Sequence, residues 1–285
     1  MARCFFTVAI VALSSWQPAQ AQDKPQPVTV RKLTLVEYAT VFYPSGNLNI
    51  EAYVYSPKGS GPFPAVVYNH GNRGPDKEKD EAPTEYIGNA LKEAGYVVLV
   101  TERRGWGKSD GQGYADAVGK DDPDKLAQRL NHEADDVLAA VEYVRTLPHV
   151  DRKHVGVMGW SLGGQVTLLA AARGHDIQVA VAQAPGALSW AKSPTVQKLL
   201  KEAAGKIDVP TALMAAENDA TTENVRTLSE ILQKRKIPQE LIVYPPFAPK
   251  GDADGSHPGH YLFGPGGVDI WKADLLKFIG PRLGK

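Results

Sequence analysis

One stretch in the middle of the chain, residues 154–173, restricts the possible fold more than any other. It reads HVGVMGWSLGGQVTLLAAAR, an apolar run that passes through G-W-S-L-G (159–163) into a run of small and apolar residues. This pattern predicts a β-strand, a tight turn and an α-helix, with Ser161 at the tip of the turn. Side chains at Gly159 and Gly163 would collide with the neighbouring helix and strand, so a turn this tight requires glycine at both positions.

Ser161 is the candidate reactive residue of this turn. We expect strained backbone angles that project its hydroxyl away from the sheet, beside the positive end of the following helix. A glycine-rich connection without chemical meaning could contain the same letters. The strand before the turn and the helix after it are the context that a nucleophilic serine needs, and they favour the chemical interpretation.

The N-terminus has the layout of a secretory signal peptide over residues 1–21. Arg3 precedes an apolar run that is too short to span a membrane, and Ala19-Gln20-Ala21 (residues 19–21) offers a cleavage site between small residues. We expect a secreted or periplasmic protein with a flexible N-terminal arm at residues 22–32. A buried N-terminal helix is the alternative, but the run would be uncapped and poorly amphipathic.

Residues 33–285 fit a single domain of ordinary size. Lysine and arginine together number 32, and aspartate and glutamate also number 32, which gives no electrostatic reason to expect binding to nucleic acid or, after signal cleavage, to a membrane. The only cysteine, Cys4, would leave with the signal peptide. The exported protein would therefore have neither a disulfide nor a cysteine nucleophile.

Strand and helix patterns alternate from residue 48 to the C-terminus, which predicts an α/β fold. We expect a mostly parallel central sheet with helices on both faces and an N-terminal antiparallel hairpin at one edge, turning at Pro44–Asn47. The expected strands are Leu33–Tyr43, Leu48–Tyr55, Pro64–Asn69, Tyr96–Thr101, Val155–Met158, Val179–Ala184, Thr211–Ala216 and Glu240–Tyr244. The expected helices are Tyr86–Ala94, Asp122–Thr146, Gln165–Ala172, Val196–Ala204, Thr222–Lys234 and Val268–Ile279.

A serine nucleophile needs a histidine to take its proton and a carboxylate to orient that histidine, in the chain order serine, acid, histidine. Functional groups of a parallel sheet collect where its strands end. Glu217 and Asp219 follow one expected strand, and we favour Asp219 because Glu217 still belongs to the strand end. An N-cap on the next helix is the other role open to Asp219.

His257 and His260 follow the last expected strand, and either could be the base. We favour His260, because the apolar residues after it could hold its loop against the core, and keep His257 as the alternative. A metal site at these two histidines has little support, since only Asp252 and Asp254 lie nearby in the sequence.

Two backbone donors are needed for the oxyanion that forms when Ser161 attacks a carbonyl. Leu162 follows the serine directly and supplies the first N–H group. The second is expected from Gly71 or Asn72, in the loop after the strand Pro64–Asn69. His70 precedes the nucleophile in the chain, so we interpret it as a structural, hydrogen-bonded residue.

Residues 104–109 read RGWGKS and raise the possibility of a phosphate-binding loop. The full motif requires glycine where Glu102 stands, and Gly111 and Gly113 break the helix that should follow. We therefore interpret this segment as a tight connection close to the active site.

Together these segments resemble a known family. The stretches GPFPAVVYNHG, RRGWGKSDG, HEADDVLAAVEYVRTLPHVD, GWSLGGQ, AENDATT and GHYLFGPGGVDIW are similar to the serine branch of the dienelactone hydrolase-like α/β-hydrolases, and also to the catalytic domain of prolyl oligopeptidases and to acetyl xylan esterases. The resemblance runs from about Glu37 to the C-terminus and implies an α/β-hydrolase fold for the predicted domain at residues 33–285. It also implies Ser161 as nucleophile, Asp219 as acid and His260 as base.

The expected function is that of a serine hydrolase that cleaves small carboxylic esters through an acyl-enzyme, without cofactor or metal. Only the short segment Pro185–Val209 separates two late strands, so no large cap domain is expected. An open site is anticipated, and Trp106, Trp160 and Trp190 could each line it or simply pack in the core or on the surface. A peptidase of the prolyl oligopeptidase type and a non-catalytic binding protein on the same fold are the alternatives.

Overall fold

The computed structural model describes residues 38–120, 122–174, 176–249 and 256–285. The predicted signal peptide (1–21) and arm (22–32) lie outside this part of the chain, as do residues 33–37 of the predicted domain. Among the helices described, none has both the length and the apolar character that crossing a membrane would require.

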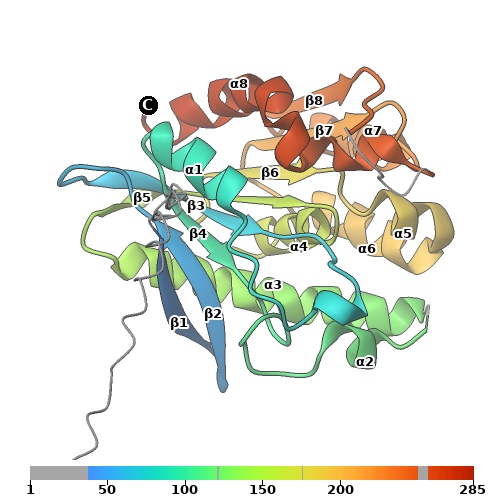
Figure 1. Cartoon of the computed structure of the whole chain (residues 1–285). Coiled ribbons are helices and arrows are strands. Elements are labelled where there is room, and N and C mark those ends of the chain that lie inside the picture. Colours follow the sequence, from blue (N-terminus) through green and yellow to red (C-terminus); the bar gives the residue numbers. More distant parts are fainter. Residues whose placement is uncertain (1–37, 121, 175, 250–255) are drawn as a thin grey trace, which may run out of the picture. The chain divides into compact units, whose positions relative to one another are not determined.

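An eight-stranded sheet runs through the centre of the domain, with the strand order β1-β2-β4-β3-β5-β6-β7-β8 (Figure 1). Strand β2 pairs antiparallel with β1 and β4, and all later neighbours are parallel. The mostly parallel sheet with a hairpin at its edge is thus confirmed. The strands are β1 (Ala39–Ser45), β2 (Leu48–Tyr55), β3 (Phe63–Asn69), β4 (Val97–Thr101), β5 (Val150–Trp160), β6 (Val179–Gln183), β7 (Thr211–Ala216) and β8 (Gln239–Tyr244).

Helices cover both faces of the sheet, as predicted. Helices α1 and α8 pack on one face, and α3, α4, α6 and α7 pack on the other (Figure 1). The helices are α1 (Glu85–Glu93), α2 (Tyr114–Val118), α3 (Pro123–Thr146), α4 (Leu162–Ala171), α5 (Ala187–Lys192), α6 (Pro194–Ala204), α7 (Glu223–Lys234) and α8 (Val268–Ile279). Short 3₁₀-helices occur at η1 (Pro75–Lys77), η2 (Pro258–Phe263), η3 (Pro265–Gly267) and η4 (Gly280–Arg282).

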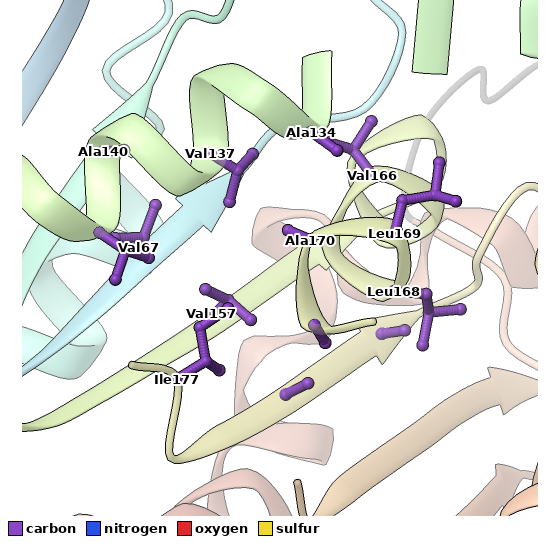
Figure 2. Close-up of a cluster of buried hydrophobic side chains, with 14 of the residues drawn as sticks. Val67, Ala134, Val137, Ala140, Val157, Val166, Leu168, Leu169, Ala170 and Ile177 are labelled. Carbon is purple, nitrogen blue, oxygen red and sulfur yellow. The ribbon is translucent and has the colours of Figure 1, made fainter. Parts of the chain in front are cut away.

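The two faces of the sheet carry separate apolar cores because side chains alternate along each strand. In β3, Val67 belongs to the core under α3 and α4, whereas its neighbours Val66 and Tyr68 belong to the core under α1 and α8. Figure 2 shows the first core, where Val67 lies among side chains that include Val137 of α3 and Val166 of α4. Burial of this apolar surface is the main force that holds the helices on the sheet.

The strand order places the ends of β3 and β5 at a topological switch point. Strand β3 pairs with β4 on one side and with β5 on the other, so the chain leaves it in one direction and later returns on its opposite side. Ligands of open α/β sheets bind outside the carboxyl ends of the strands at such a point. The loops after Asn69 and Trp160 therefore meet where a site is expected.

The structure corrects two details of the sequence-based prediction. The hairpin turn is shorter than Pro44–Asn47, because β1 continues to Ser45 and only Gly46 and Asn47 connect the strands. The Ser45 hydroxyl donates a buried hydrogen bond to Oδ1 of Asp136 in α3, 2.7 Å away, which holds the strand end in place. Helices α2 and α5 were not predicted, since elements of five and six residues show no helical periodicity.

The turn at Ser161 is as tight as its glycines indicated. A Cβ atom on Gly163 would lie 2.0 Å from the carbonyl oxygen of Asn69, and one on Gly159 would lie 2.4 Å from that of Gly163. The start of α4 therefore touches the end of β3 directly, and no larger residue fits between them.

We expect Gly163→Ala to lower the free energy of unfolding by at least about 3 kcal/mol, because the new methyl group meets main-chain atoms that cannot rotate away. Urea denaturation would measure the change. Gly205→Ala is the matched control. Gly205 caps α6 with φ −63°, an angle that alanine adopts readily. The free energy of unfolding of Gly205→Ala should therefore stay within about 0.5 kcal/mol of the wild-type value.

Candidate active site

Ser161 lies between the last residue of β5 and the first residue of α4. Its backbone angles, φ +57° and ψ −119°, belong to a region that side-chain-bearing residues rarely occupy. Two hydrogen bonds hold this conformation: the Ser161 N–H donates to the carbonyl of Gln183 (2.9 Å), and the Ser161 carbonyl accepts from the N–H of Gln165 (3.2 Å). The strained turn presents the hydroxyl outside the sheet.

The structure brings Ser161, His260 and Asp219 together in one hydrogen-bonded chain. Nε2 of His260 is 2.8 Å from Oγ of Ser161, and Nδ1 of His260 is 3.0 and 3.1 Å from the two carboxylate oxygens of Asp219. The Asp219 side chain is fully buried, and the His260 side chain is 14% exposed. Asp219 does not cap α7; Thr222 occupies the N-cap position, and Asp219 instead accepts the N–H of Ala220.

The partners of His260 determine which ring nitrogen carries the hydrogen. A carboxylate can only accept, so Nδ1 of His260 must donate to Asp219. In the neutral ring, Nε2 is then free to accept the proton of the Ser161 hydroxyl. The arrangement is that of a nucleophile, a general base and a group that orients the base.

Close contacts between loops, which the sequence analysis did not identify, bring the histidine to the acid. The side-chain amide of Asn218 both donates to the carbonyl of Phe247 (2.8 Å) and accepts its N–H (2.9 Å), which joins the loops after β7 and β8. A Cβ atom on Gly259 would lie 2.4 Å from Oδ1 of Asn218. Nε1 of Trp160 donates to the carbonyl of His260 (3.0 Å). In the sequence, the one available signal for this close approach of the two loops was the glycine directly before the candidate base.

The loop after β3 lies against the serine. A Cβ atom on Gly71 would be 3.2 Å from Cβ of Ser161, so the backbone there passes very near the candidate nucleophile. The N–H groups of Gly71 and Asn72 have no backbone acceptor among the residues that the structure describes. The N–H of Leu162, at the first position of α4, has no acceptor within its own helix. These N–H groups could together receive a developing negative charge.

Buried ion pairs hold this loop from beneath. Arg73 donates to both carboxylate oxygens of Glu102, at 3.2 and 2.6 Å. Arg103 donates to the carbonyl of His70 (2.9 Å) and to the buried carboxylate of Glu133 (2.7 Å). Because buried charges must keep their partners, these contacts fix the path of the loop on both sides of Gly71 and Asn72.

Burial also shifts the protonation of the groups beneath the loop. Desolvation, together with the positive charges of Arg103 and Arg73, holds the pKa of His70 well below 6.5, so its ring is neutral. Nδ1 of the His70 ring lies 2.6 Å from the carbonyl oxygen of Gly71. Desolvation raises the pKa of Glu102, and the nearby Arg73 opposes that rise. His70 is structural and hydrogen-bonded, as its place in the sequence suggested.

A pocket of about 140 Å³ opens at the serine. It is lined by Asn72, Tyr114, Leu126, Ser161, Leu162, Gln165, Gly186, Ala187, Leu188, Ser189 and His260. Of the two roles left open for Trp106, Trp160 and Trp190, packing is the one observed, since none of them lines this pocket. Trp106 and Trp190 are fully buried in the core, and Trp160 supports the histidine loop. The unpredicted helices α2 and α5 supply the walls instead.

His257, the alternative base, precedes η2, and its carbonyl accepts the N–H of His260 (3.0 Å). Among the described contacts, its ring bonds to neither Ser161 nor Asp219. Asp252 and Asp254 lie outside the described residues. Within the residues that are described, no group of three or more histidine, cysteine, aspartate or glutamate side chains could hold a metal ion.

The neutral state of His70 makes stability depend on pH. The unfolded chain binds the proton near pH 6.5 and the folded protein does not, so stability should fall as the pH drops below 6.5, by at most about 1.4 kcal/mol per pH unit from this group. His70→Asn keeps a donor near the Gly71 carbonyl and removes the titration. Its free energy of unfolding, measured in urea across this pH range, should vary less steeply; equal slopes would contradict the assignment.

Comparison with known proteins places the chain in a family. Residues 50–255 match the Dienelactone hydrolase family. The chain is 28% identical, over 145 residues, to the quorum-quenching protein AidA of Acinetobacter baumannii. That match covers 51% of this chain and 43% of AidA, so the chain spans less than half the length of this relative.

Solved structures show the same fold at low sequence identity. An esterase of Pyrococcus furiosus has a TM-score of 0.62 at 20% identity, with 87% of this chain and 92% of the esterase covered. The acylaminoacyl peptidase of Pyrococcus horikoshii has a TM-score of 0.63 at 17% identity, with 87% of this chain but only 42% of the peptidase covered. The chain therefore has the α/β-hydrolase fold and belongs to the dienelactone hydrolase family.

Proposed function

We propose that the protein is a serine hydrolase that cleaves small carboxylic esters through an acyl-enzyme. The observation that carries this proposal is the chain of hydrogen bonds from Asp219 through His260 to Ser161, at 3.0 and 2.8 Å, at the mouth of a pocket. Membership of a hydrolase family supports it, and the printed name of the Pyrococcus furiosus relative is that of an esterase.

In the acylation half-reaction, Nε2 of His260 takes the hydroxyl proton as Oγ of Ser161 attacks the ester carbonyl. The carbonyl electron pair moves to its oxygen, where the N–H of Leu162 and that of Gly71 or Asn72 stabilise the charge. The pair then returns, the bond to the alcohol oxygen breaks, and His260 gives its proton to that oxygen. Asp219 stabilises the imidazolium between these steps.

Deacylation repeats the sequence with water. His260 removes a proton from water, the oxygen attacks the acyl carbonyl, and the Ser161 oxygen leaves with the proton that His260 returns. The products are a carboxylic acid and the free enzyme. A lactone, which is a cyclic ester, would open by the same steps into one hydroxy acid.

The chemistry alone does not separate an esterase from a peptidase. The structural match covers most of this chain but under half of the acylaminoacyl peptidase, so the described domain corresponds to only a part of that enzyme. Paired p-nitrophenyl esters and aminoacyl p-nitroanilides would compare the two bonds directly. Faster turnover of the anilides would replace the ester proposal with a peptidase.

We expect Ser161→Ala to lower kcat/KM for p-nitrophenyl butyrate by at least about 10⁴-fold, and Asp219→Asn by about 10²- to 10⁴-fold. A fluorophosphonate probe should add one adduct to the wild type and none to Ser161→Ala, as measured by intact-protein mass. His257→Ala and His260→Ala form a matched pair. Only the second should lose activity, and the reverse result would assign the base to His257.

We expect Gly259→Ala to lower kcat at least about tenfold, because the methyl group would push the histidine loop away from Asn218 and weaken the bond between Asp219 and His260. KM should change less, since His260 is the only lining residue of the pocket that belongs to this loop. Gly266→Ala, in the same connection, has nothing nearer than 4.0 Å to its new methyl group and is the control. Equal kcat in both variants would show that Gly259 does not position the base.

A further inference from the structure

A second, larger pocket adjoins the one at Ser161. Its volume is about 510 Å³, against about 140 Å³ for the first. The two share five lining residues, which are Asn72, Tyr114, Leu126, Leu188 and Ser189. The smaller pocket is below the roughly 300–1,000 Å³ of sites that enclose an organic ligand, so a substrate larger than a simple acetate must extend beyond it. The second pocket is the continuous space into which it can extend.

The near wall of the second pocket is apolar and fixed. Tyr114 and Val118 come from α2, Leu126 from α3 and Leu188 from α5, helices that lie on one side of the domain (Figure 1). The Tyr114 ring is held between Trp106, 5.4 Å away between ring centroids, and the guanidinium of Arg129, 5.8 Å from its centroid. A wall that is already ordered costs little further entropy when a ligand binds.

Leu188 supplies the apolar surface that lacks a partner. Its side chain is 44% exposed and lines both pockets together with Tyr114 and Leu126, so it belongs to a shared apolar surface and is not an isolated exposed leucine. By contrast, the nearby carboxylate of Asp122 already accepts two N–H groups, those of Asp124 and Lys125, at the start of α3. The second pocket is also lined by polar side chains, those of Asn72, Ser189, Lys192 and Ser193. The apolar side chains between the serine and α2 are therefore one part of a mixed surface, and they are the part that a hydrocarbon chain can contact.

The position of His260 decides which half of an ester faces this pocket. His260 must give a proton to the departing alcohol oxygen, so the alcohol lies on the His260 side of Ser161. The second pocket is lined by no residue of η2 or of the described part of the loop before it. It leads away from His260, to the side where the acyl part of the substrate must lie.

We infer that the second pocket binds the aliphatic acyl chain of the substrate, so that the enzyme prefers esters of medium-chain fatty acids over acetates. This inference rests on the proposed ester hydrolysis at Ser161. The hydrocarbon chain would pass between Leu126 and Leu188 and end against Val118 of α2.

The first experiment measures kcat/KM along a series of p-nitrophenyl esters from acetate to decanoate. We expect a rise of at least about tenfold from acetate to octanoate, because each methylene that leaves water stabilises the bound state. A parallel series of alkyl acetates, from ethyl to octyl, lengthens only the alcohol and should show no such rise. A flat acyl series, or a rise in the alcohol series, would overturn the assignment.

Val118 lines only the second pocket. Two variants of this residue therefore test directly whether the acyl chain lies there. Val118→Trp fills the pocket, and Val118→Asp makes it charged at nearly unchanged volume. Because Val118 is only 6% exposed, far-UV circular dichroism first checks that each variant is folded, and if neither is, the acyl and alcohol series on the wild type decide the inference. Each should lower kcat/KM for octanoate about tenfold or more and leave acetate within about twofold. Asp116→Trp is the matched control, since Asp116 is an exposed residue of α2 that lines neither pocket. Equal losses on both esters would contradict the inference.

A binding measurement separates this inference from the proposed function. Calorimetric titration of p-nitrophenyl octanoate into Ser161→Ala measures affinity without turnover. Binding that weakens about tenfold when Val118→Trp is added supports the acyl pocket. If the wild type cleaves no ester, the proposed function fails, and the inference about substrate fails with it. If the esters are cleaved but the affinity for p-nitrophenyl octanoate is the same with and without Val118→Trp, the proposed function stands and only the assignment of the acyl pocket is contradicted.

Discussion

The contact between the start of α4 and the end of β3 is the constraint on which the rest of the structure depends. Gly163 lies so close to the carbonyl of Asn69 that no side chain fits, and Gly159 lies close enough to the carbonyl of Gly163 to exclude one as well. This approach forces Ser161 into an unusual backbone conformation and brings it to within van der Waals reach of Gly71. One packing contact thus places a hydroxyl, a helix N-terminus and the loop after β3 beside one another.

The remaining groups reach this point through loops that are tied to each other. The Asn218 amide joins the loops after β7 and β8, and Trp160, next to the serine, donates a hydrogen bond to the carbonyl of His260. Beneath the opposite side, Arg73 and Arg103 anchor the loop after β3 through buried carboxylates. The geometry at Ser161 is therefore defined by neighbours that do not themselves contact the reacting atoms.

Much of the fold could be predicted from the sequence because its strong signals are local. Strand β7 and helix α8 have the predicted bounds, since β7 is a short, continuous apolar run and α8 has a helical pattern, and both have clear ends. The turn at Ser161 was predictable because its glycines satisfy a steric demand within five residues. Because the carboxyl ends of parallel strands meet at one edge of a sheet, the places of Asp219 and His260 after two strands predicted that both lie near the serine.

What could not be predicted depends on contacts between distant segments. The sequence did not decide between a site role and plain packing for Trp106; its indole N–H pairs with the buried carboxylate of Glu133, 27 positions later in the chain. The preference for His260 over His257 rested on apolar neighbours, whereas the close approach at Gly259 involves a loop some forty residues earlier. Helices α2 and α5 are too short to show a period, yet both contribute residues to the wall of the pocket.

The position of α5 in the connection between β6 and β7 has an evolutionary consequence. The groups proposed to carry out the chemistry sit at strand ends, where the core tolerates little change, whereas the wall that faces a substrate belongs to a surface excursion of the chain. Mutations that lengthen, shorten or reshape that excursion can alter which molecules enter without disturbing the sheet. The residues that determine the substrate range and those that form the reactive centre therefore lie in separate parts of the chain. Selection can act on one part while the other stays constant.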